Sequence, residues 1–363
     1  MFVPIWRVVP FLGGKVVHVP DGFFNVATSV SAGAVAAAGV AVCLRGARRE
    51  LDDRTAPMAG LVAAFIFAVQ MLNFPVAAGT SGHLLGGALA AILVGPYTGV
   101  LCMAVVLLVQ AVFFADGGLT ALGVNVTIMG LVTVLAGWAV FRVVTGFARG
   151  KGGVTAAAFL AALVSVPASA LVFTLLFWIG GTAPISVGAV AAAMGGVHLL
   201  IGIGEGVITA VTVGAVLAVR PDLVYGARNL ARPLVLRGAD GESTTVAGSA
   251  APQPVAAAPA GGRLKPFLLG GVGVTLVLAG LVSFFASPDP DGLEAVAENQ
   301  GFGEQAGEHA FSGWALADYG EVGDIPVGIA GIIGVGLVLL IAGAVAFAAR
   351  NRDAATKRDG VRA

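Results

Sequence analysis

The sequence has very little charge for its length. Only 11% of its 363 residues are Asp, Glu, Lys or Arg, whereas 58% are hydrophobic, and the mean hydropathy is +0.95. Soluble domains carry roughly twice that charged fraction. A water-soluble core cannot hold so many apolar side chains, so the composition excludes an ordinary soluble protein and favours one that lies in a lipid bilayer.

Cysteine and nucleotide-binding motifs are also scarce. Both cysteines, Cys43 and Cys102, lie in apolar runs, where we expect packing residues and no disulfide. The Gly- and Lys-containing stretches "GGKVV" and "RGKGG" lack the Ser/Thr and the spacing of a Walker A motif. We therefore expect a chain that does not hydrolyse ATP and is not an enzyme.

Long apolar segments occupy most of the chain. Because a membrane-spanning helix needs about 20 apolar residues, the sequence predicts an all-α polytopic membrane protein. We expect a seven-helix body followed by a two-helix C-terminal membrane domain. The predicted spans are 24–44, 57–78, 82–96, 97–115, 119–141, 155–180, 187–219, 266–286 and 326–349.

Lys and Arg indicate the orientation. They cluster after the first, fifth and seventh spans and in the C-terminal tail, so an outside N-terminus places every cluster in the cytoplasm. The loop 288–324, with nine acidic residues and no Lys or Arg, then lies outside. We expect a multi-pass protein of the cell membrane with a cytoplasmic C-terminus. Only Arg7 and Lys15 break this pattern.

Composition also divides the chain into parts. The stretch 236–262 is rich in Ala, Pro, Gly and Ser, which is typical of a flexible linker, and the orientation above places it in the cytoplasm. The expected parts are an N-terminal extension from a misassigned start (1–16), a transmembrane body (17–235), the linker (236–262), a two-span domain (263–350) and a basic cytoplasmic tail (351–363).

Two of the four histidines are candidate metal ligands. His18 begins the first span, and His83, in "NFPVAAGTSGHLLGG", lies at the same predicted end of the third. The fold can therefore bring them together. Two imidazoles alone are a weak metal signal, because most sites need three or four ligands. The alternative is a pair of interfacial histidines.

Val17 adds ligands if translation starts there. A GTG codon encodes Val internally and Met at initiation, so the mature chain would begin Met-His-Val-Pro-Asp-Gly. Its α-amine, the His18 amide nitrogen and the His18 imidazole form one chelating unit, and His83 supplies a fourth nitrogen. Four nitrogens in a plane suit Ni(II) and low-spin Co(II). This start also removes Arg7 and Lys15.

His198 and Glu205 form a possible intramembrane polar pair on the seventh span. They are seven residues apart, about two turns, and share a helix face. A carboxyl group inside a membrane helix is costly and usually functional, although an interhelical polar clamp is the alternative.

A competing function is an intramembrane serine protease that uses Ser81 and a histidine, which requires hydrogen-bond contact between the two.

Four blocks of the sequence resemble the CbiM/NikM family, the cobalt or nickel substrate-specificity components of energy-coupling-factor (ECF) ABC transporters. They are "HVPDGFFNVATSV", "NFPVAAGTSGHLLGGALAAILVGPYTGV", "GGLTALGVNVTIMG" and "HLLIGIGEGVIT", within about 17–225. The resemblance implies metal ligands at His18 and His83, with Val17 in the place of the initiator Met. Asn73 and Asn125 lie in matching blocks, and the resemblance implies that they orient His83 without binding the metal themselves.

The tail, with "PDPDGLEAVAE", resembles the PDGLE domain, a CbiN/NikN-like accessory partner. Together the resemblances imply uptake of cobalt or nickel ions as transported substrates, with no cofactor, and cobalt slightly preferred. They imply a CbiQ-like transmembrane scaffold and CbiO-like ATP-binding subunits as partners, membrane lipid around them, and no nucleic acid. We expect the acidic loop to attract cations without supplying a primary ligand.

The Val17–His18 context predicts a native N-terminus at position 17, as methionine. N-terminal sequencing of protein expressed from the native gene tests this start, and peptides from residues 1–15 would contradict it.

Overall fold

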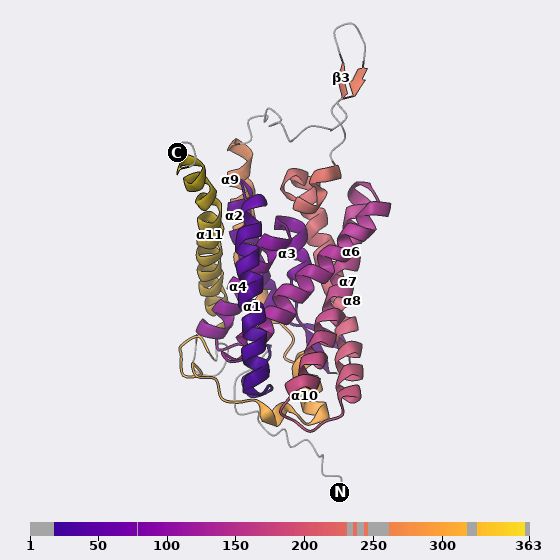
Figure 1. Cartoon of the computed structure of the whole chain (residues 1–363), viewed down its shortest axis with the longest axis vertical. Helices are drawn as coiled ribbons and strands as arrows, with labels where there is room; N and C mark the ends of the chain where they lie inside the picture. The colour runs from indigo at the N-terminus through magenta and orange to yellow at the C-terminus, as the bar shows by residue number, and fades with distance from the viewer. Residues whose placement is uncertain are drawn as a thin grey trace.

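The computed structural model describes residues 18–77, 79–230, 235–237, 243–245, 261–317 and 325–359. It is a bundle of roughly parallel and antiparallel helices (Figure 1), which confirms the expected all-α membrane fold. Residues 18–25 and helix α10 lie at one end of the bundle, which we call the site end. Val17, the N-terminal extension and most of the linker fall outside the described residues.

The body contains seven helical segments. The sixth predicted transmembrane segment and the seventh are the longest, because their apolar runs hold few charged residues: Lys151 in the first turn of the sixth and Glu205 in the middle of the seventh. The segments are α1 (Val26–Gly46), α2 (Thr55–Gln70), α3 (Gly87–Val94), α4 (Pro96–Phe113), the combined α5 (Leu122–Asn125), π-helix η2 (Val126–Val132) and α6 (Thr133–Phe147), then α7 (Gly150–Gly180) and α8 (Val187–Val219).

Short elements connect these helices and build the C-terminal part. The short 3-10 helices are η1 (Ala47–Arg49), η3 (Pro221–Leu223), η4 (Tyr225–Leu230), η5 (Val282–Phe285) and η6 (Gly303–Gln305). The C-terminal helices are α9 (Gly261–Gly280), α10 (Gly292–Gln300) and α11 (Val327–Asp359). Within the expected linker, β3 (Val235–Arg237) pairs with β4 (Ser243–Thr245).

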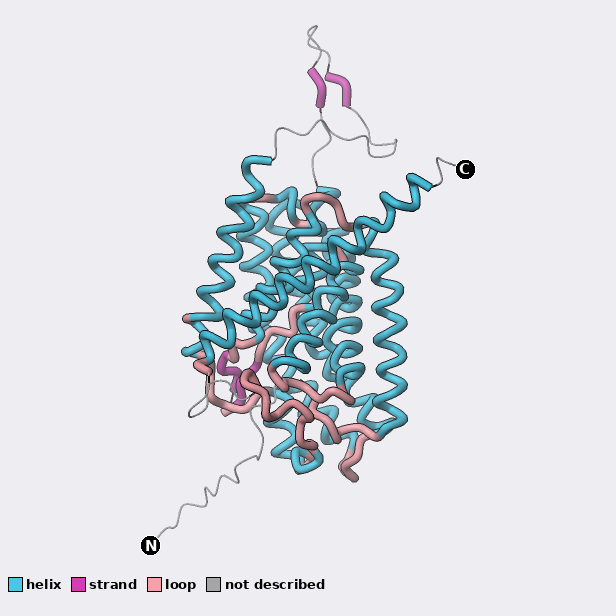
Figure 2. Tube along the Cα trace, turned by 90° about the vertical axis from the view of Figure 1, so that its left-hand side faces the viewer, coloured by secondary structure: helices cyan, strands magenta, loops and turns pink. Residues whose placement is uncertain are grey.

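Two predicted spans are shorter than expected. By length and composition, seven helices of the described residues can cross a membrane, and α2 and α3 are not among them. α3 has only eight residues, about 12 Å of helix, because the residues before it take another conformation. β1 (Phe74–Ala77) and β2 (Thr80–Gly82) form an antiparallel hairpin near the site end (Figure 2). The prediction of a complete span over 82–96 was therefore wrong.

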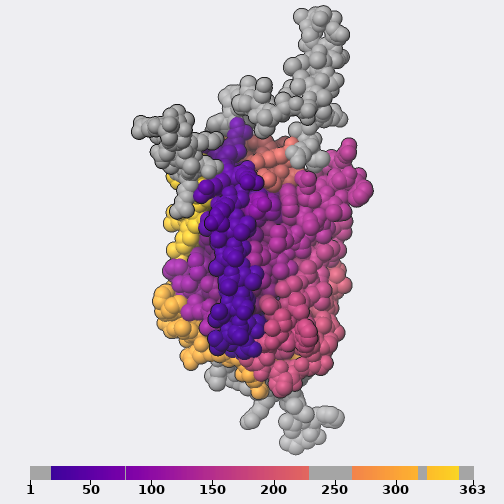
Figure 3. Space-filling view, viewed as in Figure 1, coloured from indigo at the N-terminus to yellow at the C-terminus, as the bar shows by residue number. Residues whose placement is uncertain are grey.

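The C-terminal helices pack directly on the body. α11 contacts α2, α4 and α9. Gly334 of α11 lies so close to α2 that a Cβ there would be 2.1 Å from the Phe67 ring. A side chain at this position would push the helices apart, so the glycine lets the two-span tail join the bundle closely. α1, by contrast, lies along an open face of the molecule (Figure 3), with Val26 79% exposed.

The other end of the bundle is held by charged side chains. Asp52 accepts hydrogen bonds from the backbone of Arg54 and Thr55 at the start of α2. Burial acts to raise the pKa of the Asp52 carboxyl, but these hydrogen bonds outweigh it, and the pKa is lowered. Arg350 of α11 pairs with Asp53. These charged side chains therefore connect α11 to the α1–α2 loop.

Candidate metal centre

His18 sits in an extended segment that the body holds on both sides. The side chain of Asn125 bonds both backbone groups of the next residue, Val19. Asn125 Oδ1 accepts from Val19 N (3.1 Å), and Asn125 Nδ2 donates to Val19 O (3.0 Å). Gly118 N also donates to Val19 O (2.9 Å). These bonds satisfy a buried, non-helical backbone and fix the position of His18.

The Pro-Asp-Gly turn after His18 anchors the segment to two loops. Asp21 accepts from the backbone nitrogen of Thr120 (2.7 Å) and from that of Leu119 (3.2 Å). Gly22 has φ +92°, and a Cβ there would lie 2.2 Å from the carbonyl oxygen of Gln305. Only glycine meets both conditions without strain. Asn25 then caps α1 by accepting from Thr28 N.

His83 lies between the β1–β2 hairpin and α3, in a loop organised by Glu205 of α8. The two carboxyl oxygens of Glu205 accept from Leu85 N (2.6 Å) and Gly86 N (3.0 Å). Gln70 donates to Leu85 O (3.0 Å). Since Glu205 is fully buried, this interaction explains why a carboxyl group is retained inside an apolar helix.

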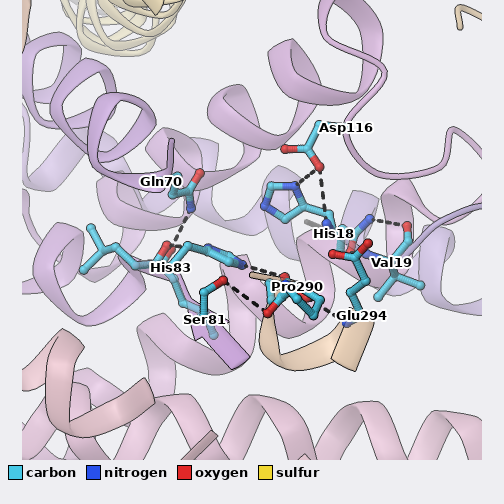
Figure 4. A network of polar contacts seen from close by, with 12 residues as sticks. His18, Val19, Gln70, Ser81, His83, Asp116, Pro290 and Glu294 are labelled. Atoms are coloured by element: carbon cyan, nitrogen blue, oxygen red, sulfur yellow. Dashed lines mark hydrogen bonds and ion pairs between the residues drawn. The ribbon is translucent and has the colours of Figure 1, made fainter. Parts of the chain in front are cut away.

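The structure brings His18 and His83 together, as the sequence predicted. Their ring centroids are 5.4 Å apart with an edge-on arrangement, and both residues are buried. Asp116 Oδ1 lies 3.0 Å from His18 Nδ1 and 3.3 Å from His18 N (Figure 4). Neither ring nitrogen of His18 has a hydrogen bond of good geometry among the described residues. Nδ1 faces the Asp116 carboxylate, so Nε2 is the ring nitrogen left for a further ligand.

A cavity of about 40 Å³ lies between the two histidines. That is enough volume for one water molecule or ion. Polar groups of His18, His83, His198, Asn125 and Asp291 share its wall with apolar side chains such as Ile128, Phe173 and Ile201. The cavity is thus a small polar site within an apolar surround.

The predicted polar pair on α8 has a different arrangement. His198 lines the cavity, and its Nδ1 lies 2.9 Å from Met194 O, whereas Glu205 bonds the backbone of the His83 loop. The two side chains thus face the same region and serve separate contacts. Glu205 therefore acts as a polar clamp between α8 and the loop before α3.

The structure gives the contacts of the two asparagines proposed to orient His83. Asn125 positions the His18 segment, and no contact with His83 is seen for it among the described residues. Asn73 accepts from Ser287 N of the tail through its backbone oxygen (2.7 Å). Among the described residues, the ring nitrogens of His83 make their polar contacts with Leu84 O and Asp291.

The arrangement of Ser81 does not support a serine protease. Its hydroxyl donates to the backbone oxygens of Asp289 (2.8 Å) and Pro290 (3.2 Å). A serine nucleophile needs its hydroxyl hydrogen-bonded to a base. Here that hydroxyl instead attaches the tail to the β1–β2 hairpin.

Sequence reasoning missed two carboxylates at the site. Asp116 follows the end of α4 and contacts His18, and Asp291 caps α10 and lies 3.5 Å from His83 Nε2. For Asp291 the available signal was the repeated Pro-Asp-Gly, at 20–22 and at 290–292, whereas Asp116, in "FADGG", lies outside both repeats. Within the described residues, no three His, Cys, Asp or Glu side chains are already arranged to hold an ion.

The chain belongs to the family of the cobalt uptake substrate-specific transmembrane region (CbiM), whose family model matches residues 18–223. The PDGLE domain model matches residues 265–351. The chain is therefore a multi-pass membrane component of cobalt or nickel transport, with a PDGLE domain behind the body.

Several known proteins are similar to the body. A putative metal transport protein of Haloquadratum walsbyi is 42% identical over 57% of this chain and 93% of its own length. A putative fused nickel transport protein, NikMN, of Archaeoglobus fulgidus is 41% identical over 57% of this chain and 68% of its own. A crystal structure of a transition metal transporter matches with a TM-score of 0.51 and 25% identity, over 56% of this chain and 93% of that one.

Glu205→Ala should destabilise the protein strongly, because it leaves the buried N–H groups of Leu85 and Gly86 without an acceptor. Unpaired buried groups cost about 1–3 kcal/mol each, so the loss should be about 2–6 kcal/mol. Thermal unfolding in detergent measures it. The control is Thr209→Ala, one turn along α8, whose buried hydroxyl has no hydrogen-bond partner among the described residues. Equal melting temperatures for the two variants would contradict the clamp.

Proposed function

We propose that the chain is the substrate-specificity component of an ECF-type ABC transporter and captures Co(II) or Ni(II) at the cavity between His18 and His83. One observation carries the proposal. Two imidazoles from segments 65 residues apart in sequence meet at a buried cavity, and Nε2 of His18 has no hydrogen-bond partner among the described residues. Imidazole nitrogen is a suitable donor for nickel and cobalt.

The remaining ligands come from the start of the mature chain. With methionine at position 17, the α-amine and the His18 amide nitrogen join the two imidazoles in a four-nitrogen set. Asp116 Oδ1 already lies beside both the amide nitrogen and Nδ1 of His18, so these two nitrogens face a common point. The nickel transport named for the A. fulgidus relative accords with such a donor set.

Transport itself requires other chains. The body offers a small occluded site, and we find no Walker A sequence, so ATP hydrolysis falls to separate CbiO-like subunits acting through a CbiQ-like scaffold. Basic residues Arg45, Arg54, Arg220 and Arg350 lie at the helix ends opposite the site. The positive-inside rule then puts the site end outside the cell and the C-terminus inside.

His83→Ala should remove tight metal binding while the protein still folds and inserts. An entire imidazole ligand is lost. Removing only a group that orients a ligand already costs about 10–100-fold in metal affinity, so we expect affinity for Ni(II) or Co(II) to fall at least about 100-fold. Titration calorimetry of the purified protein measures this.

The matched control is His309→Ala, which removes the imidazole of the C-terminal part that bonds Phe311 N, outside the cavity. Its affinity should equal that of the unaltered chain. An unchanged affinity for His83→Ala would make His83 a packing residue and refute the proposed site.

A further inference from the structure

The C-terminal part reaches the metal cavity through the loop before α10. Ser81 N donates to Pro290 O (2.8 Å), and Ser81 Oγ donates to Asp289 O (2.8 Å). Asn73 O accepts from Ser287 N (2.7 Å). These bonds join the loop to β2 and to the residue before β1, and they place Asp291 and Gly292 in the wall of the cavity.

Asp291 has its two carboxylate oxygens in different roles. Oδ1 accepts from Glu294 N (2.7 Å), which caps α10. Oδ2 points to His83 Nε2 at 3.5 Å. The residue is only 2% exposed, so water does not solvate its carboxyl group, which needs polar partners inside the protein.

The contact of His83 Nδ1 determines whether Nε2 carries a hydrogen or a lone pair. Nδ1 lies 3.0 Å from the carbonyl oxygen of Leu84. A carbonyl only accepts, so we assign the ring hydrogen to Nδ1. In the neutral ring, Nε2 then presents a lone pair. A backbone carbonyl on the far nitrogen is also the usual support of a metal-bound histidine.

A lone pair and a carboxylate oxygen therefore face each other inside the protein. Two acceptors cannot hydrogen-bond each other, so either a proton or a metal cation has to lie between them. Bonds of about 2.0–2.2 Å join imidazole nitrogen and carboxylate oxygen to a divalent transition metal. Two such bonds to one ion span the nitrogen–oxygen distance of 3.5 Å at an angle of about 105–122°.

We propose that Asp291 of the C-terminal part is a metal ligand, which binds the same ion as His83. The inference rests on the proposed function, because it adds a donor to that site. It also replaces the expectation that the tail supplies no primary ligand. The site is then built by two parts of the chain, and its donors include one anionic oxygen.

The test compares the purified full chain with Asp291→Asn. Asparagine has nearly the same shape and is an equally good helix N-cap, so α10 should remain in place while the carboxylate charge is lost. Asp291→Ser keeps a capping oxygen but is too short to reach the ion. The matched control is Asp289→Asn, in the same loop, whose side chain bonds Ser287.

Affinity for Ni(II) and for Co(II) is measured by competition with a chelator, and the visible absorption of the bound metal reports its ligands. Both Asp291 variants should bind at least 10-fold more weakly and show a shifted absorption band, whereas Asp289→Asn should match the unaltered chain.

Unchanged affinity and absorption in the Asp291 variants would overturn the proposal and leave Asp291 as an ion-pair partner of a protonated His83. Failure of the unaltered chain to bind either metal would instead overturn the proposed function itself. The two failures are therefore distinguishable.

Discussion

The structure depends on satisfying the hydrogen bonds of non-helical backbone inside an apolar bundle. Residues 18–25 and 80–86 are not helical, so their N–H and C=O groups need partners that lipid cannot supply. Asn125 meets this need for Val19, and Glu205 meets it for Leu85 and Gly86. Because the same bonds fix the segments that carry His18 and His83, they also set the geometry of the cavity.

The C-terminal part belongs to this arrangement and is not an independent appendage. α11 packs along α2 and α4, while the loop before α10 attaches to the β1–β2 hairpin. Phe302 of this part is fully buried against Phe23 and Phe177 of the body. The fusion therefore keeps Asp291 close to His83 at a high effective concentration. A separate chain would have to bind first.

The sequence predicted the fold class and the pairing of His18 with His83, because both follow from apolar length, the alternation of spans and shared blocks. It did not predict that 82–86 is non-helical, with β2 ending at Gly82 and Gly86 in a left-handed conformation. That conformation depends on Glu205, 120 residues from Leu85 in sequence, and no local pattern records such a partner. The roles of Asn125 and Asp291 were missed for the same reason: each contact crosses more than 100 residues.

Local rules nevertheless accounted for several details once the fold was known. Asn25 and Asp291 are typical helix N-caps, and Gly22 occupies a backbone conformation that favours glycine. What local rules cannot supply is the direction in which a capping residue's second oxygen points. In Asp291 that oxygen faces His83, and this long-range placement gives the turn a function beyond capping.

The central claim is that one metal ion binds between His18 and His83. Anomalous diffraction at the cobalt edge, from crystals of the full chain grown with Co(II), tests it most directly. The account predicts one strong peak within bonding distance, about 2 Å, of His83 Nε2 and beside His18. A peak confined to the acidic residues around Glu304 and Glu308, with none at the histidines, would contradict it.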